Sequence, residues 1–201
     1  MKQLPNYLTI FRLIIIPIMV VAFYIPGMLA NVVVAILFAI AAITDYFDGY
    51  FARALRAESN FGKCLDPIAD KLLVIVAIIM LINFSNHDLY ILIPGLIIVC
   101  REVLVSGLRE FLAEFHVVVP VSRLAKWKTA VQMTAITGLL LGEKGSSYTL
   151  YYFFSDWKEF GLKLLIINFV VLVSKALFIL SALLTIITGF SYFKAGIKKM
   201  N

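Results

Sequence analysis

Long uninterrupted apolar runs constrain the fold of this chain more than any other feature. Six stretches are long enough to cross a bilayer as helices, which takes about 20 residues each. They cover roughly residues 8–25, 30–52, 67–84, 89–112, 124–142 and 162–192. Of the 201 residues, 62% are apolar and 15% are charged, more apolar surface than a globular core of this size can hide. We therefore expect an all-α membrane protein, with six transmembrane helices in one bundle and one domain over residues 1–201.

The charge balance excludes other classes of protein. The chain carries 18 Lys and Arg against 12 Asp and Glu, a formal net charge of +6. Apolar runs separate the basic residues, so attraction to anionic membrane lipids explains them better than binding to nucleic acid. Cys64 and Cys100 match no zinc or disulfide spacing. A signal peptide is disfavoured because Arg12 interrupts the first apolar run. Together with the excess of apolar residues, these observations exclude a soluble enzyme, a disordered chain and a nucleic-acid-binding domain.

The basic residues also predict the orientation in the membrane. The connections at residues 25–27 and 83–90 hold neither Lys nor Arg. Basic residues instead follow the second run, open the fifth run and close the chain: Arg53, Arg56 and Lys63, then Arg123, Lys126 and Lys128, then Lys194, Lys198 and Lys199. Because Lys and Arg are enriched in cytoplasmic loops, we expect both termini in the cytoplasm.

Four of the six aspartates lie in two pairs, Asp45 with Asp48 and Asp66 with Asp70. Residues three or four apart share one face of a helix. The short connection at residues 56–61 folds the third run back beside the second, so we expect the pairs to face each other. Four close carboxylates repel unless a cation neutralises them. Oxygen ligands favour Mg²⁺, Mn²⁺ or Ca²⁺ over zinc, and two ions about 3.5–4 Å apart are common in phosphoryl chemistry.

A plainer interpretation is that these pairs are interfacial charges matched by neighbouring arginines and lysines. Gly49 and Ala52 weigh against it, because they leave the second helix bare beside the carboxylates. A bulky ligand can then approach the backbone closely. Small residues also serve ordinary helix packing in membranes, so Gly49 alone proves nothing.

The acidic pairs belong to a longer pattern, Asp45-x2-Asp48-Gly49-x2-Ala52-Arg53-x8-Gly62-x3-Asp66-x3-Asp70. All its fixed positions resemble the signature of the CDP-alcohol phosphotransferases. The resemblance implies transfer of a phosphatidyl group from CDP-diacylglycerol to an alcohol, with release of CMP, at the cytoplasmic face of a bacterial inner membrane. It implies two divalent cations, Mg²⁺ or Mn²⁺, on the four aspartates and a general base at Asp70. It further implies that cytidine diphosphate binds Gly49, Ala52, Arg53 and Gly62.

Three more segments resemble the phosphatidylglycerophosphate synthase branch of this family, whose acceptor is sn-glycerol 3-phosphate. They are Pro5-Asn6-x2-Thr9-x2-Arg12, Arg101-Glu102 with Gly107-Leu108-Arg109-Glu110, and residues 125–133. A phosphorylated acceptor needs cations that the acidic pairs do not supply. The available ones are Arg101, Arg109, Arg123, Lys126 and Lys128.

Helical geometry limits how these cations can act together. Arg101 and Arg109 lie about 80° apart around a helix, so both can border one cavity. Lys126 and Lys128 lie about 200° apart, so only one of them can face it. The alternative is that Arg101 pairs with Glu102 and that Arg109 serves the cytoplasmic charge bias. The first segment likewise offers either further substrate contacts at Asn6, Thr9 and Arg12 or a helix cap followed by an interfacial arginine.

Other functions remain open at this stage. A membrane prenyltransferase also uses aspartates and Mg²⁺, but its acidic motifs sit in well-separated repeats. An intramembrane aspartyl protease needs two aspartates without the arginine and glycines. A divalent-cation transporter would place the carboxylates near mid-membrane, away from basic residues. Within the family, the acceptor could instead be serine, an inositol phosphate or phosphatidylglycerol. The resemblance also implies a homodimer.

Overall fold

The computed structural model describes residues 4–26, 28–55, 60–85, 88–115, 123–142 and 160–200. Side chains are described for residues 7–26, 29–44, 65–85, 88–115, 124–142, 169–194 and 196. The predicted contacts of Asn6, Asp45, Asp48, Gly49, Ala52, Arg53, Gly62 and Arg123 therefore fall on residues whose side chains are outside the described set. The backbone of each of these residues is described.

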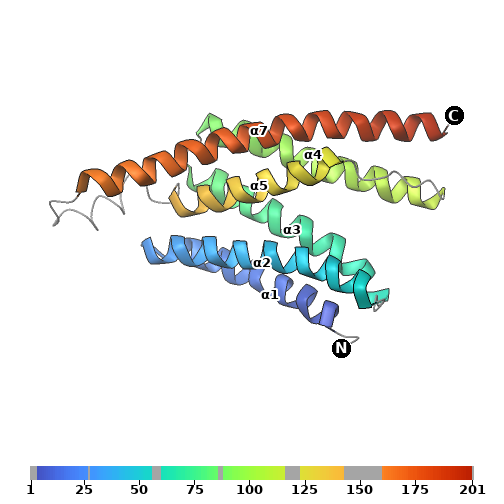
Figure 1. Cartoon of the computed structure of the whole chain (residues 1–201), viewed down its shortest axis with the longest axis horizontal. Coiled ribbons are helices and arrows are strands. Elements are labelled where there is room, and N and C mark those ends of the chain that lie inside the picture. Colours follow the sequence, from blue (N-terminus) through green and yellow to red (C-terminus); the bar gives the residue numbers. More distant parts are fainter. Residues whose placement is uncertain are drawn as a thin grey trace.

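The described part of the chain is entirely helical. It contains six helices, α1 Leu4–Tyr24, α2 Met28–Leu55, α3 Asn60–Phe84, α4 Leu89–Glu114, α5 Arg123–Gly142 and α7 Phe160–Met200. Successive helices run in opposite directions, and the two termini lie at the same end of the bundle (Figure 1). The all-helical prediction is thus confirmed, and each predicted run falls on one helix.

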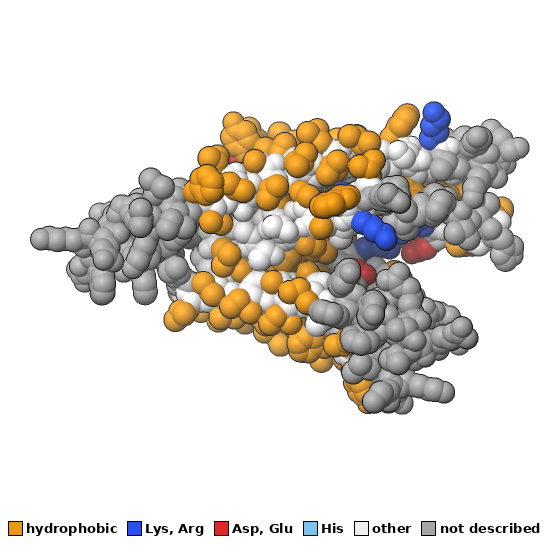
Figure 2. Space-filling model, viewed as in Figure 1, with side chains coloured by type: hydrophobic (Ala, Val, Ile, Leu, Met, Phe, Trp, Pro, Cys, Tyr) orange, Lys and Arg blue, Asp and Glu red, His pale blue; other side chains and the backbone are white. Residues whose placement is uncertain are grey.

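Among the residues whose side chains are described, three helical stretches are long and apolar enough to cross a membrane: Tyr7–Tyr24, Leu89–Glu114 and Phe169–Lys194. The apolar part of α2, Leu29–Thr44, is shorter. On the face seen in Figure 2, hydrophobic side chains cover the middle of the molecule, and most of the charged side chains that are visible lie towards one end. So large an exposed apolar surface marks contact with a membrane. The chain is therefore a membrane protein, and six crossings remain a prediction.

Several helices extend beyond the predicted apolar runs into the polar segments that flank them. The helix α3 begins at Asn60, so Pro67 lies inside the helix and not at its start. Pro17 and Pro94 likewise lie inside α1 and α4. Proline is tolerated inside membrane helices because neighbouring groups satisfy the backbone carbonyl that it leaves without a partner. Asp66 and Asp70 consequently both lie on continuous helix, as their spacing predicted.

Each helix contributes to a single apolar core. Met19, Phe38, Ile78, Ile98, Ile136 and Phe178, one from each helix, have no exposed surface. The helix α5 packs mainly against α7, which also packs along α4. The first helix packs against both α2 and α3, more extensively than these two pack against each other. As a result, α1 reaches the acidic segments of the two helices that follow it.

Glycines let helices approach closely at two of these interfaces. A Cβ atom added at Gly95 of α4 would lie 2.9 Å from Ile78 Cγ2 of α3. A Cβ atom at Gly138 of α5 would overlap the Ser174 hydroxyl of α7. Small residues at contacts are the usual way in which membrane helices gain packing energy.

An ion pair fixes α4 beside α7 at the end opposite the termini. Asp88 caps α4 by accepting a hydrogen bond from the Tyr90 N–H at 2.8 Å. Lys175 Nζ of α7 donates a hydrogen bond to the other carboxylate oxygen of Asp88, Oδ2, at 2.7 Å. Burial raises the pKa of Asp88, but the hydrogen bonds from Lys175 and Tyr90, together with the Lys175 charge, outweigh it and lower the pKa below its ordinary value.

Replacing Asp88 should destabilise the bundle in a pH-dependent way. Asp88→Ala removes the cap and the ion pair and should lower the free energy of unfolding by about 1–3 kcal/mol. Asp88→Asn keeps a capping oxygen and should lose less. Because the folded pKa is depressed, the wild-type advantage over Asp88→Asn is complete above the unfolded pKa of about 3.9 and is lost as the pH falls through the folded pKa. Thermal unfolding in detergent across this range measures both effects, and a difference that does not shrink at low pH would contradict the ion pair.

Candidate functional site

The carboxylates of α3 lie against two polar side chains of α1. Thr9 Oγ1 donates a hydrogen bond to Asp66 Oδ1. Arg12 Nη1 forms an ion pair with Asp70 Oδ1, and Arg12 Nη2 lies 3.6 Å from Asp66 Oδ1. The spacing of Thr9 and Arg12 places both on the α1 face that packs against α3.

The burial of these groups is unequal. The Arg12 side chain has no exposed surface, whereas Asp66 and Asp70 expose 35% and 38% of theirs. A guanidinium in such a position is retained only when paired, because an unpaired charge in an apolar bundle is strongly unfavourable. Arg12 therefore supports the carboxylates from inside the bundle, and their outer parts remain accessible to a ligand.

The other acidic pair shares this end of the bundle. Asp45 and Asp48 lie in the last turns of α2, and Asp66 and Asp70 lie in the first turns of the antiparallel α3 (Figure 1). Among the described side chains, no group of three or more His, Cys, Asp or Glu is close enough to hold a metal ion. The described side chains include only Asp66 and Asp70 of the predicted cluster, so the four-aspartate site remains a prediction.

A second polar cluster joins α4, α5 and α7. Glu102 of α4 pairs with Lys128 Nζ of α5 and lies 3.5 Å from Arg101 Nη1. Arg101 Nη2 also donates a hydrogen bond to Thr188 Oγ1 of α7 at 3.1 Å. The ion pair of Arg101 with Glu102, left open by the sequence, is therefore present. It coexists with contacts that bring Lys128 to the same carboxylate.

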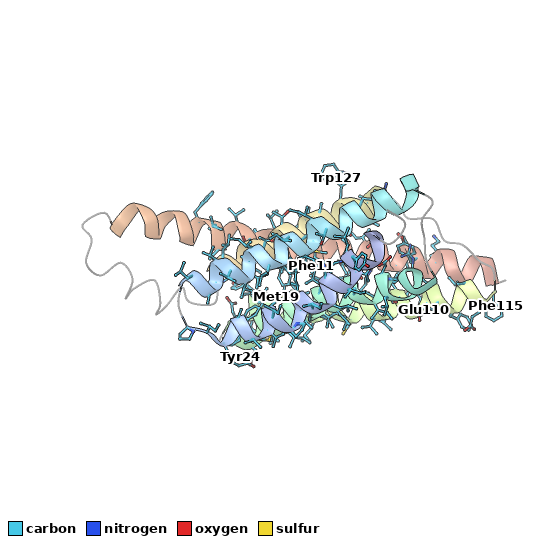
Figure 3. The ribbon with its side chains drawn as sticks, turned by 90° about the horizontal axis from the view of Figure 1, so that it is seen from below. Phe11, Met19, Tyr24, Glu110, Phe115 and Trp127 are labelled. Atoms are coloured by element: carbon cyan, nitrogen blue, oxygen red, sulfur yellow. The ribbon has the colours of Figure 1, made fainter. Side chains whose placement is uncertain are left out.

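Only one of the two predicted lysines points inwards. Lys128 is buried, and Lys126 is exposed. Trp127 between them is 70% exposed and points away from the bundle (Figure 3). This confirms that the two lysines do not face one cavity, and it assigns the inner position to Lys128.

Arg109 joins the second cluster through an aromatic ring. Its Cζ lies 5.3 Å from the ring centroid of Tyr192 in α7, and the Cζ of Arg101 lies 5.7 Å from the same centroid. Both distances lie within the range of cation–π attraction. Arg101 and Arg109 therefore both lie near Tyr192, and that they border one cavity, as the sequence suggested, stays a prediction.

Lys71 connects the two clusters and was not identified from the sequence. It directly follows Asp70 on α3, and its Nζ contacts Ser106 Oγ of α4. Ser106 lies between Arg101 and Arg109 in the sequence and reaches Glu110 at 3.5 Å. The α3 segment that carries Asp70 therefore contacts the α4 segment that carries Arg101 and Arg109.

Thr188 and Tyr192 were also missed, although α7 carried a signal. Four polar residues, Ser174, Ser181, Thr185 and Thr188, recur at helical spacing in this largely apolar helix, and all four are buried. Such a stripe indicates a helix face turned towards other polar groups.

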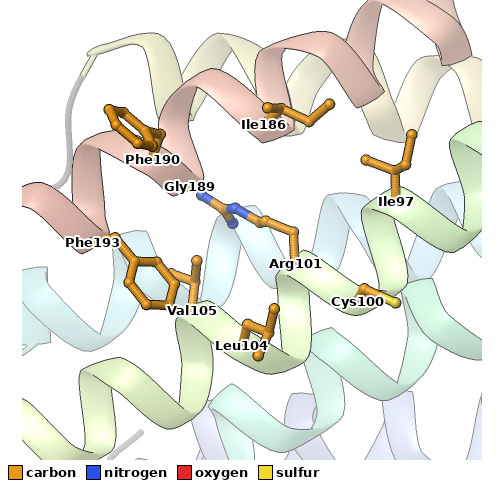
Figure 4. Close-up of a pocket in the computed structure, with 9 residues that line it drawn as sticks. All are labelled: Ile97, Cys100, Arg101, Leu104, Val105, Ile186, Gly189, Phe190 and Phe193. Atoms are coloured by element: carbon orange, nitrogen blue, oxygen red, sulfur yellow. The ribbon is translucent and has the colours of Figure 1, made fainter.

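An open recess of about 400 Å³ separates α4 from α7 beside Arg101. Apart from Arg101 and Gly189 its walls are apolar, and Phe190 and Phe193 lie along its α7 side (Figure 4). Such lining suits hydrocarbon better than a polar substrate.

Comparison with known proteins shows which protein family the chain belongs to. The family model described as CDP-alcohol phosphatidyltransferase matches residues 2–187. A Rickettsia felis protein named CDP-diacylglycerol–glycerol-3-phosphate 3-phosphatidyltransferase is 50% identical over 194 residues, 96% of this chain and 95% of its own length. Proteins of the same name from Wigglesworthia glossinidia brevipalpis and Haemophilus influenzae are 44% and 42% identical, over 70% and 69% of this chain and 78% and 75% of their own lengths. The chain therefore belongs to the CDP-alcohol phosphatidyltransferase family.

Proposed function

We propose that this protein transfers the phosphatidyl group of CDP-diacylglycerol to sn-glycerol 3-phosphate, giving phosphatidylglycerophosphate and CMP. One observation carries the proposal beyond family membership. Lys71, directly after Asp70 on α3, contacts Ser106 of α4, which lies between Arg101 and Arg109 in the sequence, so the segments that carry the acidic and the basic residues meet there. A reaction that joins a nucleotide-linked lipid to a phosphorylated acceptor needs both kinds of site side by side. The relatives of nearly equal length carry the name of this reaction.

The acidic residues fit divalent cations, which the family uses generally. Asp45, Asp48, Asp66 and Asp70 would hold two such ions, Mg²⁺ or Mn²⁺, through carboxylate oxygens, the ligands that these hard cations prefer. When bound, the ions neutralise the diphosphate of CDP-diacylglycerol and polarise the phosphorus under attack. Thr9 and Arg12 approach Oδ1 of Asp66 and Asp70, and these contacts do not involve the Oδ2 atoms, which could serve as ligands. We therefore propose a supporting role for Thr9 and Arg12, beside the substrate contacts that the sequence left open for them.

In the reaction that we infer, a hydroxyl oxygen of the acceptor forms a bond to the phosphatidyl phosphorus, and the bond from that phosphorus to the CMP oxygen breaks. Asp70 accepts the hydroxyl proton, for which one oxygen must lie within hydrogen-bond reach of the acceptor. Gly49, Ala52, Arg53 and Gly62 hold the cytidine diphosphate. Arg101, Arg109 and Lys128 hold the acceptor phosphate, whose roughly two negative charges suit guanidinium and ammonium donors. Lys126 is exposed and takes no part.

The same proposal places the protein in its membrane. Six crossings, both termini in the cytoplasm and a site facing the cytoplasm would let the lipid tails of CDP-diacylglycerol stay in a bacterial inner membrane. The water-soluble acceptor would then reach the polar end of the bundle. The location of both termini at one end is consistent with this topology (Figure 1). A homodimer is part of the proposal by resemblance alone.

Removing divalent cations should abolish turnover. Exhaustive chelation of the purified protein should stop CMP release from CDP-diacylglycerol and glycerol 3-phosphate, and Mg²⁺ or Mn²⁺ should restore it. Asp66→Asn should need a higher cation concentration, because it removes one ligand charge. Mn²⁺ binding followed by electron paramagnetic resonance gives a readout independent of turnover. Full activity after chelation would exclude the two-ion site.

Replacing Asp70 should separate binding from chemistry. Asp70→Asn should reduce turnover by about 10²–10⁴ or more if this carboxylate accepts the acceptor proton. Binding of CDP-diacylglycerol, measured by calorimetry in detergent with Mg²⁺ present, should change much less. If binding and turnover fall together, Asp70 serves as a metal ligand and not as the base.

Neutralising a cation of the second cluster should weaken use of the acceptor selectively. Arg101→Gln or Lys128→Gln should reduce kcat/KM for glycerol 3-phosphate about 10–200-fold, since a hydrogen bond to a charged group contributes about 1.5–3 kcal/mol. The KM for CDP-diacylglycerol should change little.

Lys126→Gln provides the matched control, because this exposed lysine lies two residues from Lys128. It should leave acceptor kinetics unchanged. The wild-type protein should also be assayed with serine, an inositol phosphate, phosphatidylglycerol and unphosphorylated glycerol as acceptors. If any of them is used better than glycerol 3-phosphate, the acceptor assignment is wrong and the reaction class stands.

A further inference from the structure

Three residues on one face of α7 enclose the side chain of Arg101. Thr188 Oγ1 accepts a hydrogen bond from Arg101 Nη2 at 3.1 Å. A Cβ atom at Gly189 would lie 3.2 Å from Arg101 Cγ and 3.5 Å from its Nε, so only glycine admits the extended stem without displacement. The ring of Tyr192 receives the guanidinium at 5.7 Å. We call Thr188, Gly189 and Tyr192 the arginine cradle.

The cradle holds the Arg101 side chain across the gap between two helices. Figure 4 shows it extending from α4 towards Gly189 of α7. Its Nη1 faces Glu102 and its Nη2 bonds to Thr188, but its buried Nε has no hydrogen-bond partner among the described residues. Buried polar atoms are normally satisfied, so an unsatisfied donor in a fixed guanidinium indicates capacity for one more acceptor.

Tyr192 also links Arg101 to the second arginine. Its ring is buried, and Arg109 lies 5.3 Å from its centroid. Two guanidinium groups from positions eight residues apart on α4 are thus drawn to one ring of α7. Like charges repel when they are held close together, so this arrangement favours an anion that can interact with both. The ring limits where each guanidinium can lie. Because the ring contacts the guanidinium by charge and not by hydrogen bonding, the N–H donors at the edges of the guanidinium groups stay available.

We propose that the arginine cradle positions Arg101 and Arg109 as a paired grip for the phosphate of the acceptor, with Tyr192 as the principal positioning residue. The inference rests on the proposed function. It gives α7 a part in acceptor recognition although this helix supplies no group to the bond-making step. The cradle acts through the arginines, so its loss should affect capture of the acceptor and leave turnover at saturation largely intact.

Paired variants of Tyr192 test the ring. Tyr192→Leu should raise the KM for glycerol 3-phosphate roughly 5- to 30-fold, because both cation–π contacts are lost. The kcat and the KM for CDP-diacylglycerol should stay within about threefold of wild type. Tyr192→Phe keeps the ring and should bring the acceptor KM back to within about threefold. A role in packing alone predicts no such split between the two substrates.

Two glycines of α7 give a matched control for the cradle. Gly189→Ala places a methyl group against Arg101, whereas Gly196→Ala places one 3.1 Å from Leu112 Cδ1 at the same helix interface. Both should lower the thermal midpoint by similar amounts. Only Gly189→Ala should raise the acceptor KM, and Gly196→Ala should leave it unchanged.

The outcomes separate this inference from the proposed function. If Arg101→Gln raises the acceptor KM while Tyr192→Leu and Gly189→Ala do not, the cradle has no positioning role and the acceptor site stands. If Arg101→Gln itself leaves acceptor kinetics unchanged, the acceptor site fails and the cradle fails with it. Equal effects of Gly189→Ala and Gly196→Ala, or equal effects of Tyr192→Leu on both substrates, would reduce the cradle to helix packing. If Tyr192→Leu does not fold, the glycine pair decides the matter.

Discussion

The ion pairs of the buried Arg12 with Asp66 and Asp70 are the interaction on which the polar end of this bundle depends. A fully buried guanidinium is strongly unfavourable without a partner, and two neighbouring carboxylates are unfavourable without a cation. Each group therefore makes the other tolerable inside an apolar bundle. The pairing also explains the arrangement of helices, because Arg12 and Thr9 meet the carboxylates only if α1 packs along α3. The acidic segment is thereby fixed before any ligand binds.

The same constraint organises the second cluster. Glu102 lies within reach of both Lys128 and Arg101, so one carboxylate compensates cations from two helices. The Lys128 side chain of α5 reaches Glu102 of α4, and α7, which packs against both helices, adds the hydrogen bond that Thr188 accepts from Arg101. The pairing leaves more positive than negative charge among Arg101, Arg109, Lys128 and Glu102. An anionic acceptor would complete that balance, which is why the cluster suits glycerol 3-phosphate.

The sequence predicted the six helices and the separate pairs of functional residues because both depend on short-range patterns. Bilayer thickness sets the length of an apolar run, and helical periodicity places Asp66 with Asp70 or Thr9 with Arg12 on one face. Contacts between helices depend on the rotation of each helix about its axis, which no local spacing specifies. For that reason the sequence left open whether Arg12 contacts substrate or is an interfacial arginine, and the roles of Lys71 and Tyr192 were missed. Periodicity could state that Lys126 and Lys128 point apart, but packing decides that Lys128 is the inner one.

The separation of the two clusters answers an electrostatic problem in the proposed reaction. Both substrates are anionic, so one continuous basic site would not distinguish the diphosphate of CDP-diacylglycerol from the phosphate of the acceptor. Divalent cations on the aspartates select the diphosphate, while fixed guanidinium and ammonium groups select the phosphate monoester. The two sites must still be close enough for the acceptor hydroxyl to reach phosphorus. Lys71, next to Asp70, contacts Ser106, between Arg101 and Arg109, and so joins the helix segments that carry the two proposed sites. Selectivity and proximity therefore come from the same helix packing, and a change that shifts α4 against α3 should affect both substrates at once.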